Sequence, residues 1–70
     1  MSHVAIIVGV SGIERYLRGR EESVDQKRAQ RFRTERAAER AAISHINAFP
    51  PVVQRYMAYR VRPAEAAQAL

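Results

Sequence analysis

A chain of 70 residues forms one domain at most, and a domain this small buries only about 60% of the surface that its unfolded chain exposes. The sequence has no cysteine, which excludes disulfides and thiolate zinc sites, and two histidines are too few for a metal cage of nitrogen and sulfur ligands. Oligomerisation is the remaining way to stabilise such a core, so we expect a homodimer.

The charge balance is strongly basic, with a formal net charge of +5 from twelve Lys and Arg against seven Asp and Glu. Lys27 is the only lysine. Arg presents a planar fork of donors that suits phosphate and carboxylate groups. The sequence is therefore compatible with a nucleic acid, an acidic protein surface or an anionic lipid as partner. A high-GC genome also enriches Arg and Ala, which is the alternative explanation.

No segment is expected to enter a membrane. A span of the bilayer takes about 20 apolar residues, and the apolar run at residues 4–10 is much shorter. No positively charged region precedes this run, as it would in a secretory signal. We therefore expect a cytoplasmic protein without membrane contact.

Residues 1–20 are predicted to form an apolar N-terminal element. The β-branched residues of the run at 4–10 favour a strand. One helical face is also possible, because four apolar residues follow helical spacing: Ile6, Val10, Ile13 and Leu17. The pattern leaves strand and helix open for residues 4–10. Ser11 and Glu14 are spaced as a capping box and Gly19 suits a helix C-terminus, which predicts a short helix between them.

Residues 23–48 are predicted to form one long charged helix. Ser23 and Gln26 are spaced as a second capping box. From Val24 the chain has no Gly or Pro until Pro50, and it is rich in good helix formers such as Ala, Arg, Gln and Glu. Residues 25–40 contain few large apolar side chains, so this part is expected to be an exposed, charged rod.

A third helix is predicted over residues 51–62, with Pro51 as its first residue and Pro63 after its end. Residues 63–70 form an Ala-rich tail, either a short helix or a frayed end. The predicted fold class is all-α: a short N-terminal element, a long central helix and a shorter third helix, packed as a helical hairpin. The single domain covers residues 1–70 and is expected to dimerise through its N-terminal apolar residues and the third helix.

No arrangement of residues in the sequence indicates catalysis. Ser44 and His45 are neighbours on the predicted helix, so their side chains point about 100° apart. Residues 9–12 have the outline of a phosphate-binding loop, but residues 13–15 lack the Lys and Ser or Thr that complete it. We expect no enzyme activity, no cofactor, no metal and no small-molecule substrate.

Two basic clusters are candidate binding surfaces. The first is a stripe at helical spacing on the long helix, which could follow phosphates or an acidic groove; Glu35 and Glu39 among its residues indicate a solvated, ion-paired face as the alternative. The second, near residues 55–62, mixes Arg with Tyr and Met, a composition typical of protein interfaces and of single-strand nucleic-acid sites. The candidate partner-binding residues are Arg33, Arg36, Arg40, Met57, Tyr59 and Arg60.

The absence of active-site chemistry favours a non-catalytic regulatory or inhibitory protein, which binds a target protein through a basic helical surface. Phages and mobile elements encode many proteins of this kind. A small basic DNA- or RNA-binding protein is the alternative, and a structural subunit of a larger assembly is a third possibility. Salt dependence distinguishes the first two, because phosphate contacts weaken steeply as salt rises.

Overall fold

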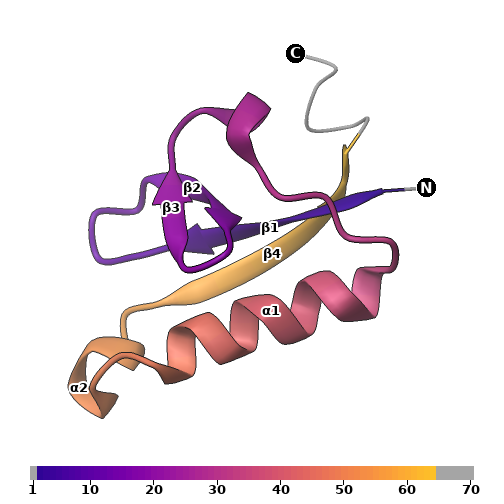
Figure 1. The fold of residues 1–70 in the computed structure, drawn as a ribbon. Helices are drawn as coiled ribbons and strands as arrows, with labels where there is room; N and C mark the ends of the chain where they lie inside the picture. The colour runs from indigo at the N-terminus through magenta and orange to yellow at the C-terminus, as the bar shows by residue number, and fades with distance from the viewer. Residues whose placement is uncertain (1, 65–70) are drawn as a thin grey trace.

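The computed structural model describes residues 2–64 and contains an antiparallel sheet of four strands with one long helix against it (Figure 1). The strands lie in the order β3-β2-β1-β4, with bounds His3–Val8 (β1), Glu14–Arg18 (β2), Glu21–Ser23 (β3) and Ala58–Pro63 (β4). The helices are η1 (Gln26–Arg28), a 3₁₀ helix, α1 (Glu35–Asn47) and α2 (Pro51–Gln54). The fold therefore combines α and β structure, and the all-α prediction of a helical hairpin is wrong. Most of the predicted Ala-rich tail lies outside the described residues.

β1 is a central strand, paired antiparallel with β2 on one side and with β4 on the other. Residues 4–7 are all buried, because both faces of β1 are covered. Since side chains alternate along a strand, Ala5 and Ile7 point toward α1 and Ile6 points to the opposite face. The open choice between strand and helix for residues 4–10 is thus settled as a strand that ends at Val8.

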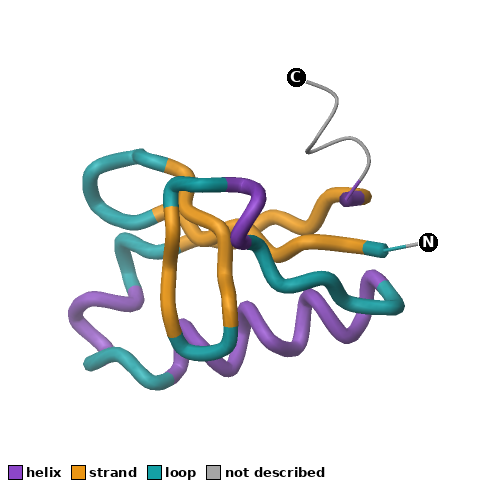
Figure 2. The backbone as a smooth tube through the Cα atoms, turned by 45° about the horizontal axis from the view of Figure 1, so that its top comes forward, coloured by secondary structure: helices purple, strands orange, loops and turns teal. Residues whose placement is uncertain are grey.

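The main core lies between α1 and the sheet (Figure 2). Its centre is formed by Ala5, Ile7 and Leu17 from the strands and by Ala38 and Ala42 from α1. The two alanines have no side chain beyond Cβ, which lets the helix lie close to β1 and β4. Partly buried side chains complete this layer: Phe32, Ala41, Ile46, Met57, Tyr59 and Val61.

The first capping-box signal belongs to a hairpin loop and not to a helix. The Ser11 hydroxyl accepts a hydrogen bond from the N–H of Ile13, over 3.3 Å, within the loop between β1 and β2. Glu14 then begins β2, so the helix predicted between Ser11 and Gly19 is wrong. Gly19 does adopt the left-handed conformation expected of it, with φ +59°, but in the turn that joins β2 to β3.

The helix predicted over residues 23–48 begins only at Glu35. Its N-cap is Thr34, whose hydroxyl accepts a hydrogen bond from the N–H of Ala37 at 3.1 Å. The signal at Ser23 reflects local turns: the Ser23 hydroxyl accepts from the N–H of Asp25 at 3.1 Å, and Asp25 then caps η1. Because η1 spans three residues, the predicted charged rod is not helical over its first part.

Tertiary hydrogen bonds explain why residues 29–32 are extended. Phe32 exchanges two backbone hydrogen bonds with His3, both 2.8 Å long, and so continues the sheet where β2 no longer pairs with β1. The N–H of Gln30 donates to the carbonyl of Leu17 at 3.0 Å, and its side-chain oxygen accepts from the N–H of Gly19 at 2.8 Å. A helix through this segment would leave the backbone groups of His3, Leu17 and Gly19 without these partners, so tertiary structure overrides helix propensity here.

The third predicted helix is limited to α2, with Pro51 at its start as expected. The prediction is wrong beyond Gln54, because residues 58–63 form β4 and pair with β1 along its whole length. In β4, Tyr59 and Val61 point toward α1, whereas Arg60 and Arg62 point to the opposite face. The segment therefore follows the two-residue period of a strand.

Candidate protein-binding site

Among the strands of the described residues, β4 lies at the edge of the sheet, since it pairs with β1 on one side only. At its end the N–H of Ala64 donates to the carbonyl of Ser2 at 2.8 Å. Backbone groups alternate between the two sides of an antiparallel strand. Counting back from Ala64, the backbone groups of Arg62 and Arg60 point toward β1, and those of Val61 and Tyr59 point outward. The edge therefore offers another strand N–H and C=O groups that have no backbone partner within residues 2–64.

An apolar groove of about 360 Å³ runs beside this edge, between α1 and the beginning of β4. Residues from both elements line it: Ile43, Ile46, Asn47, Met57, Ala58 and Tyr59. α2 and the turn that follows it expose two more large apolar side chains, Val52 at 64% and Tyr56 at 63%. Apolar surface that is gathered next to an unpaired strand edge is a feature of protein-binding sites.

The six predicted partner-binding residues do not form one surface. Met57 and Tyr59 lie together in the groove. Arg36 and Arg40 lie on α1, and their spacing of seven and three residues from Ile43 places them on the helix face beside it.

The other two predicted residues lie elsewhere. Arg33 precedes the N-cap of α1, in the loop, so it is not part of a helical stripe. Arg60 is on the far face of the sheet from α1.

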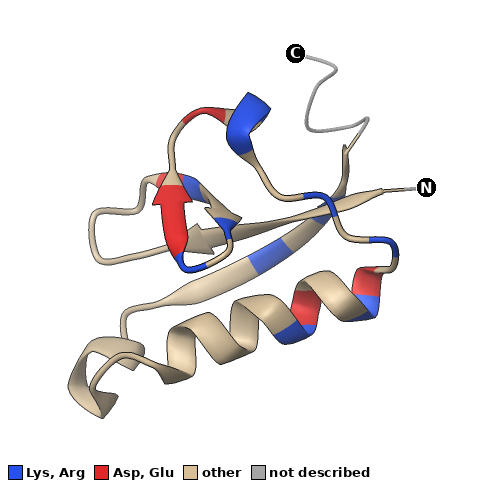
Figure 3. Cartoon of the chain, in the orientation of Figure 1, with Lys and Arg blue, Asp and Glu red and all other residues tan. Residues whose placement is uncertain are grey.

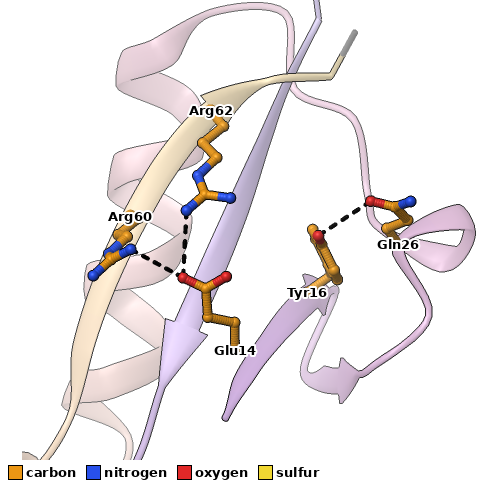
Figure 4. A network of polar contacts seen from close by, with 5 residues as sticks. All are labelled: Glu14, Tyr16, Gln26, Arg60 and Arg62. Carbon is orange, nitrogen blue, oxygen red and sulfur yellow. Dashed lines mark hydrogen bonds and ion pairs between the residues drawn. The ribbon is translucent and has the colours of Figure 1, made fainter. Parts of the chain in front are cut away.

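Arg60 belongs to an ion-pair network on that far face (Figure 4). One carboxylate oxygen of Glu14 accepts hydrogen bonds from Arg60 at 3.0 Å and from Arg62 at 3.4 Å. Because Glu14 is on β2 and the arginines are on β4, these contacts cross β1 on the face that carries the fully buried Ile6. Beside them the Tyr16 hydroxyl donates to the side-chain oxygen of Gln26 at 3.3 Å. The network lies on the same face of the sheet as a small apolar cluster of Val4 and Ala64, against which Tyr16 and Ala29 pack.

Most of the remaining basic side chains have no ion-pair partner within the described part of the chain. Among residues 2–64, only Arg60 and Arg62 of the Lys and Arg residues form an ion pair with a described carboxylate. The helical ion pairs expected for Glu35 and Glu39 are not formed with any described residue. Figure 3 shows charged residues in the first half of α1, while its second half, next to the groove, carries none. Basic and apolar surfaces are thus adjacent along one helix.

A second, larger groove of about 690 Å³ separates the β2–β3 turn from the second half of α1. At its side His45 Nε2 lies 2.7 Å from a carboxylate oxygen of Glu22, and the His45 ring meets the ring of Phe49 edge-on at 5.4 Å. Ser44 also lines the groove, but no hydrogen bond joins its hydroxyl to His45 within the described part of the chain. The pair of Glu22 and His45 therefore connects the hairpin to the helix. Among the described residues, Ser44 is not held by His45 as a nucleophile would be.

Several residues of the site escaped the sequence patterns. The sequence patterns do not indicate Ile43 and Ile46, because the predicted helix has no strand edge beside it. The same patterns place Glu14 in a helix cap, and they place Arg62 in the second basic cluster but not among the predicted partner-binding residues. The alternation of apolar and basic residues at positions 59–62 is the signal that could have identified β4 and both of its faces.

No protein-family model matches this chain, and no curated protein or solved structure matches it. Within residues 2–64 no helix has the length and apolar character needed to cross a membrane. No group of three or more His, Asp or Glu side chains in that range is arranged to hold a metal ion.

Proposed function

We propose that this protein is a non-catalytic binding protein, which regulates or inhibits a target protein by accepting an extended segment of it along the free edge of β4. One observation carries the proposal: outward backbone groups and an apolar groove meet at the same residue, Tyr59. The compartment we propose for this interaction is the cytoplasm, as expected from the sequence.

Strand addition accounts for both parts of the site. An added strand gains affinity from backbone hydrogen bonds and specificity from pockets that take alternate side chains. Every second side chain of the added strand would point to the face of the sheet that α1 covers, and so toward the groove. These side chains would be about 7 Å apart along the strand. Ile43 and Met57 provide apolar contacts there. Val52 and Tyr56 precede β4 in the chain and extend this apolar surface beyond the first residue of the strand.

The exposed arginines support a protein partner that carries acidic residues. Arg36 and Arg40 lie beside the groove, and both are exposed without an ion pair to a described carboxylate. Surface charges of this kind mainly steer a complementary partner and raise its association rate. In this proposal the two arginines favour acidic targets, while contacts with the β4 edge and the groove provide most of the affinity.

A nucleic-acid partner is the second candidate, favoured by the many exposed basic residues that lack an ion pair within residues 2–64. Phosphate contacts would make the affinity fall as a steep power of salt concentration. Binding at the β4 edge would instead depend on backbone groups, which salt affects far less. A titration of duplex and single-stranded oligonucleotides against salt separates the two candidates.

The test of strand addition removes one outward donor. Peptides are selected from a displayed library with the folded protein, and their affinities are measured by calorimetry. Val61→Pro removes an outward N–H at an edge position, where proline is tolerated in sheets, and should abolish binding. Val61→Ala retains that N–H and should bind like the original protein. Circular dichroism checks that both variants are folded, and equal binding by both variants would contradict the proposal.

A further inference from the structure

We infer that the segment accepted at β4 carries acidic side chains opposite Arg60 and Arg62 and apolar side chains on the alternate positions, and that these two arginines keep β4 from pairing with a second copy of this chain. The inference rests on the proposed function and names the chemistry of the partner. It follows from the register of β4.

Arg60 and Arg62 occupy the positions of the free edge where side chains approach a partner most closely. Their backbone groups bond to β1, so toward the outside they are non-hydrogen-bonded positions. In an antiparallel pair, residues at such positions have the shorter Cα separation, and their side chains interact directly. The residue that a new strand places opposite Arg60 therefore decides whether the contact is attractive.

The same geometry opposes self-association through β4. Two antiparallel copies can pair through β4 only with outward residues opposite one another, and four such registers pair at least three residues of each β4. In three of them, Arg60 or Arg62 stands opposite Arg60 or Arg62 of the second copy, and like charges directly opposite destabilise a sheet. In the fourth, Tyr59 stands opposite Tyr59, and only the beginning of each β4 is paired. A basic edge of this kind is a common protection against edge-to-edge pairing.

Glu14 shows which group the two arginines bind. Its carboxylate accepts a hydrogen bond from each of them on this face, as Figure 4 shows. The three side chains together keep one net positive charge, and Arg60 remains 61% exposed. Each guanidinium has further N–H donors beyond the one directed at Glu14. The face can therefore accept a second carboxylate from a partner strand.

The opposite face of the edge selects for apolar residues. Tyr59 and Val61 point toward α1, where the groove is lined by Ile43, Ile46 and Met57. A partner residue opposite Tyr59 would place its side chain over this apolar surface. Acidic residues on one face and apolar residues on the other give the partner segment a two-residue alternation.

Three peptides of about nine residues, enough to span β4, test the inference. Each has Val at every second position, with Glu, Gln or Lys between. Affinity is measured by fluorescence anisotropy, and the amide signals of Tyr59 and Val61 are followed by NMR. We expect the Glu peptide to bind about tenfold more tightly than the Gln peptide, because two opposite-charge pairs form. The Lys peptide should bind more weakly than both.

Two double variants lower the net charge by the same amount. They distinguish direct pairing of the peptide with Arg60 and Arg62 from general attraction to a basic protein. Arg60→Gln with Arg62→Gln should bring the affinities of the Glu and Gln peptides together. Arg15→Gln with Arg31→Gln removes two exposed charges away from β4 and should retain most of the difference. Equal affinity of all three peptides at the edge would overturn the inference and leave strand addition intact. If no peptide shifts the two amide signals, strand addition itself fails.

Sedimentation equilibrium tests the part that concerns self-association. The original protein should show no dimer that depends on β4. Arg60→Thr with Arg62→Thr removes the like charges and should allow a dimer to form at micromolar concentration. A dimer of the original protein that Val61→Pro dissociates would overturn this part of the inference.

Discussion

The imidazole of His45 in α1 lies 2.7 Å from the carboxylate of Glu22 in β3, which ties the β2–β3 hairpin to the long helix. His45 also contacts Phe49 edge-on, and its side chain is only 11% exposed. The short hairpin has few buried residues of its own, because Leu17 is the only one in β2 and β3. This pair is therefore an important anchor of the hairpin.

We expect His45→Ala to lower the free energy of unfolding by about 1–2 kcal/mol, from the lost hydrogen bond and the lost aromatic contact. Glu22→Gln should cost less, since an amide can still bond to the ring. Urea denaturation followed by circular dichroism measures both. If His45→Ala left stability unchanged, the hairpin would have to be held in place by other contacts.

Removal of the N-cap hydroxyl of α1 should destabilise the protein. Thr34→Ala loses the acceptor for the N–H of Ala37, and such changes typically cost about 1 kcal/mol. Ser44→Ala removes a hydroxyl from the exposed face of the same helix and should change stability by less than about 0.5 kcal/mol. Thermal unfolding of both variants provides the comparison. Similar melting temperatures for the two would argue against Thr34 as the cap.

The turn between β2 and β3 requires glycine at position 19. With φ at +59°, Gly19→Ala should cost about 1–2 kcal/mol, because a side chain is strained in this conformation. Gly9 has a negative φ and open space around it, so Gly9→Ala should be neutral or stabilise by about 0.4–1 kcal/mol. Denaturant midpoints of the two variants should therefore move in different directions, or at least by very different amounts.

Close packing of α1 on the sheet should make its buried alanines intolerant of larger residues. Ala42→Leu forces additional methylene groups into the core between the helix and β1, which typically costs about 1–3 kcal/mol. Ala37→Leu makes the same change at an exposed position and should alter stability by less than about 0.5 kcal/mol. A tolerated Ala42→Leu would show that α1 can move away from the sheet.

Local signals in the sequence predict the backbone conformation of single residues better than they predict the helix or strand that follows. Gly19 has the left-handed backbone that was expected, but it belongs to a hairpin and not to a helix end. The Ser23 hydroxyl accepts a backbone hydrogen bond, but from Asp25 in a local turn and not as the predicted capping box with Gln26. A cap or a turn residue fixes a few dihedral angles, whereas the element that follows depends on contacts made elsewhere in the chain.

The segment before Glu35 shows why the rest could not be predicted. Its Arg, Ala and Gln residues favour a helix by propensity. Gln30 and Phe32 are held extended by hydrogen bonds to Leu17, Gly19 and His3, which are distant in sequence. A local sequence pattern cannot predict hydrogen bonds to residues that are distant in the chain. The real start of the helix was nevertheless marked in the sequence by Thr34.

The candidate site was predicted in composition but not in position. Met57 and Tyr59 were selected as interface residues, and both line the groove. Which backbone groups are free depends on strand order and register, which a single sequence does not give. The predicted stripe of Arg33, Arg36 and Arg40 is incomplete for the same reason, because Arg33 lies in the loop before α1. Arg60, from the second basic cluster, lies on β4. The homodimer stays a prediction, and its interface cannot include Ile6 or Leu17, which are 0% and 1% exposed within one chain.

The pairing of β1 with β4 has a consequence for synthesis of the chain. Of the four strands, β1 is synthesised first and β4 last. During translation, one edge of β1 therefore stays unpaired until almost all of the described chain has emerged. Through that interval the apolar segment at residues 4–7 presents an open edge, which is the kind of surface that chaperones bind and that nucleates aggregation. A chain that stops before Ala58 would retain this edge permanently.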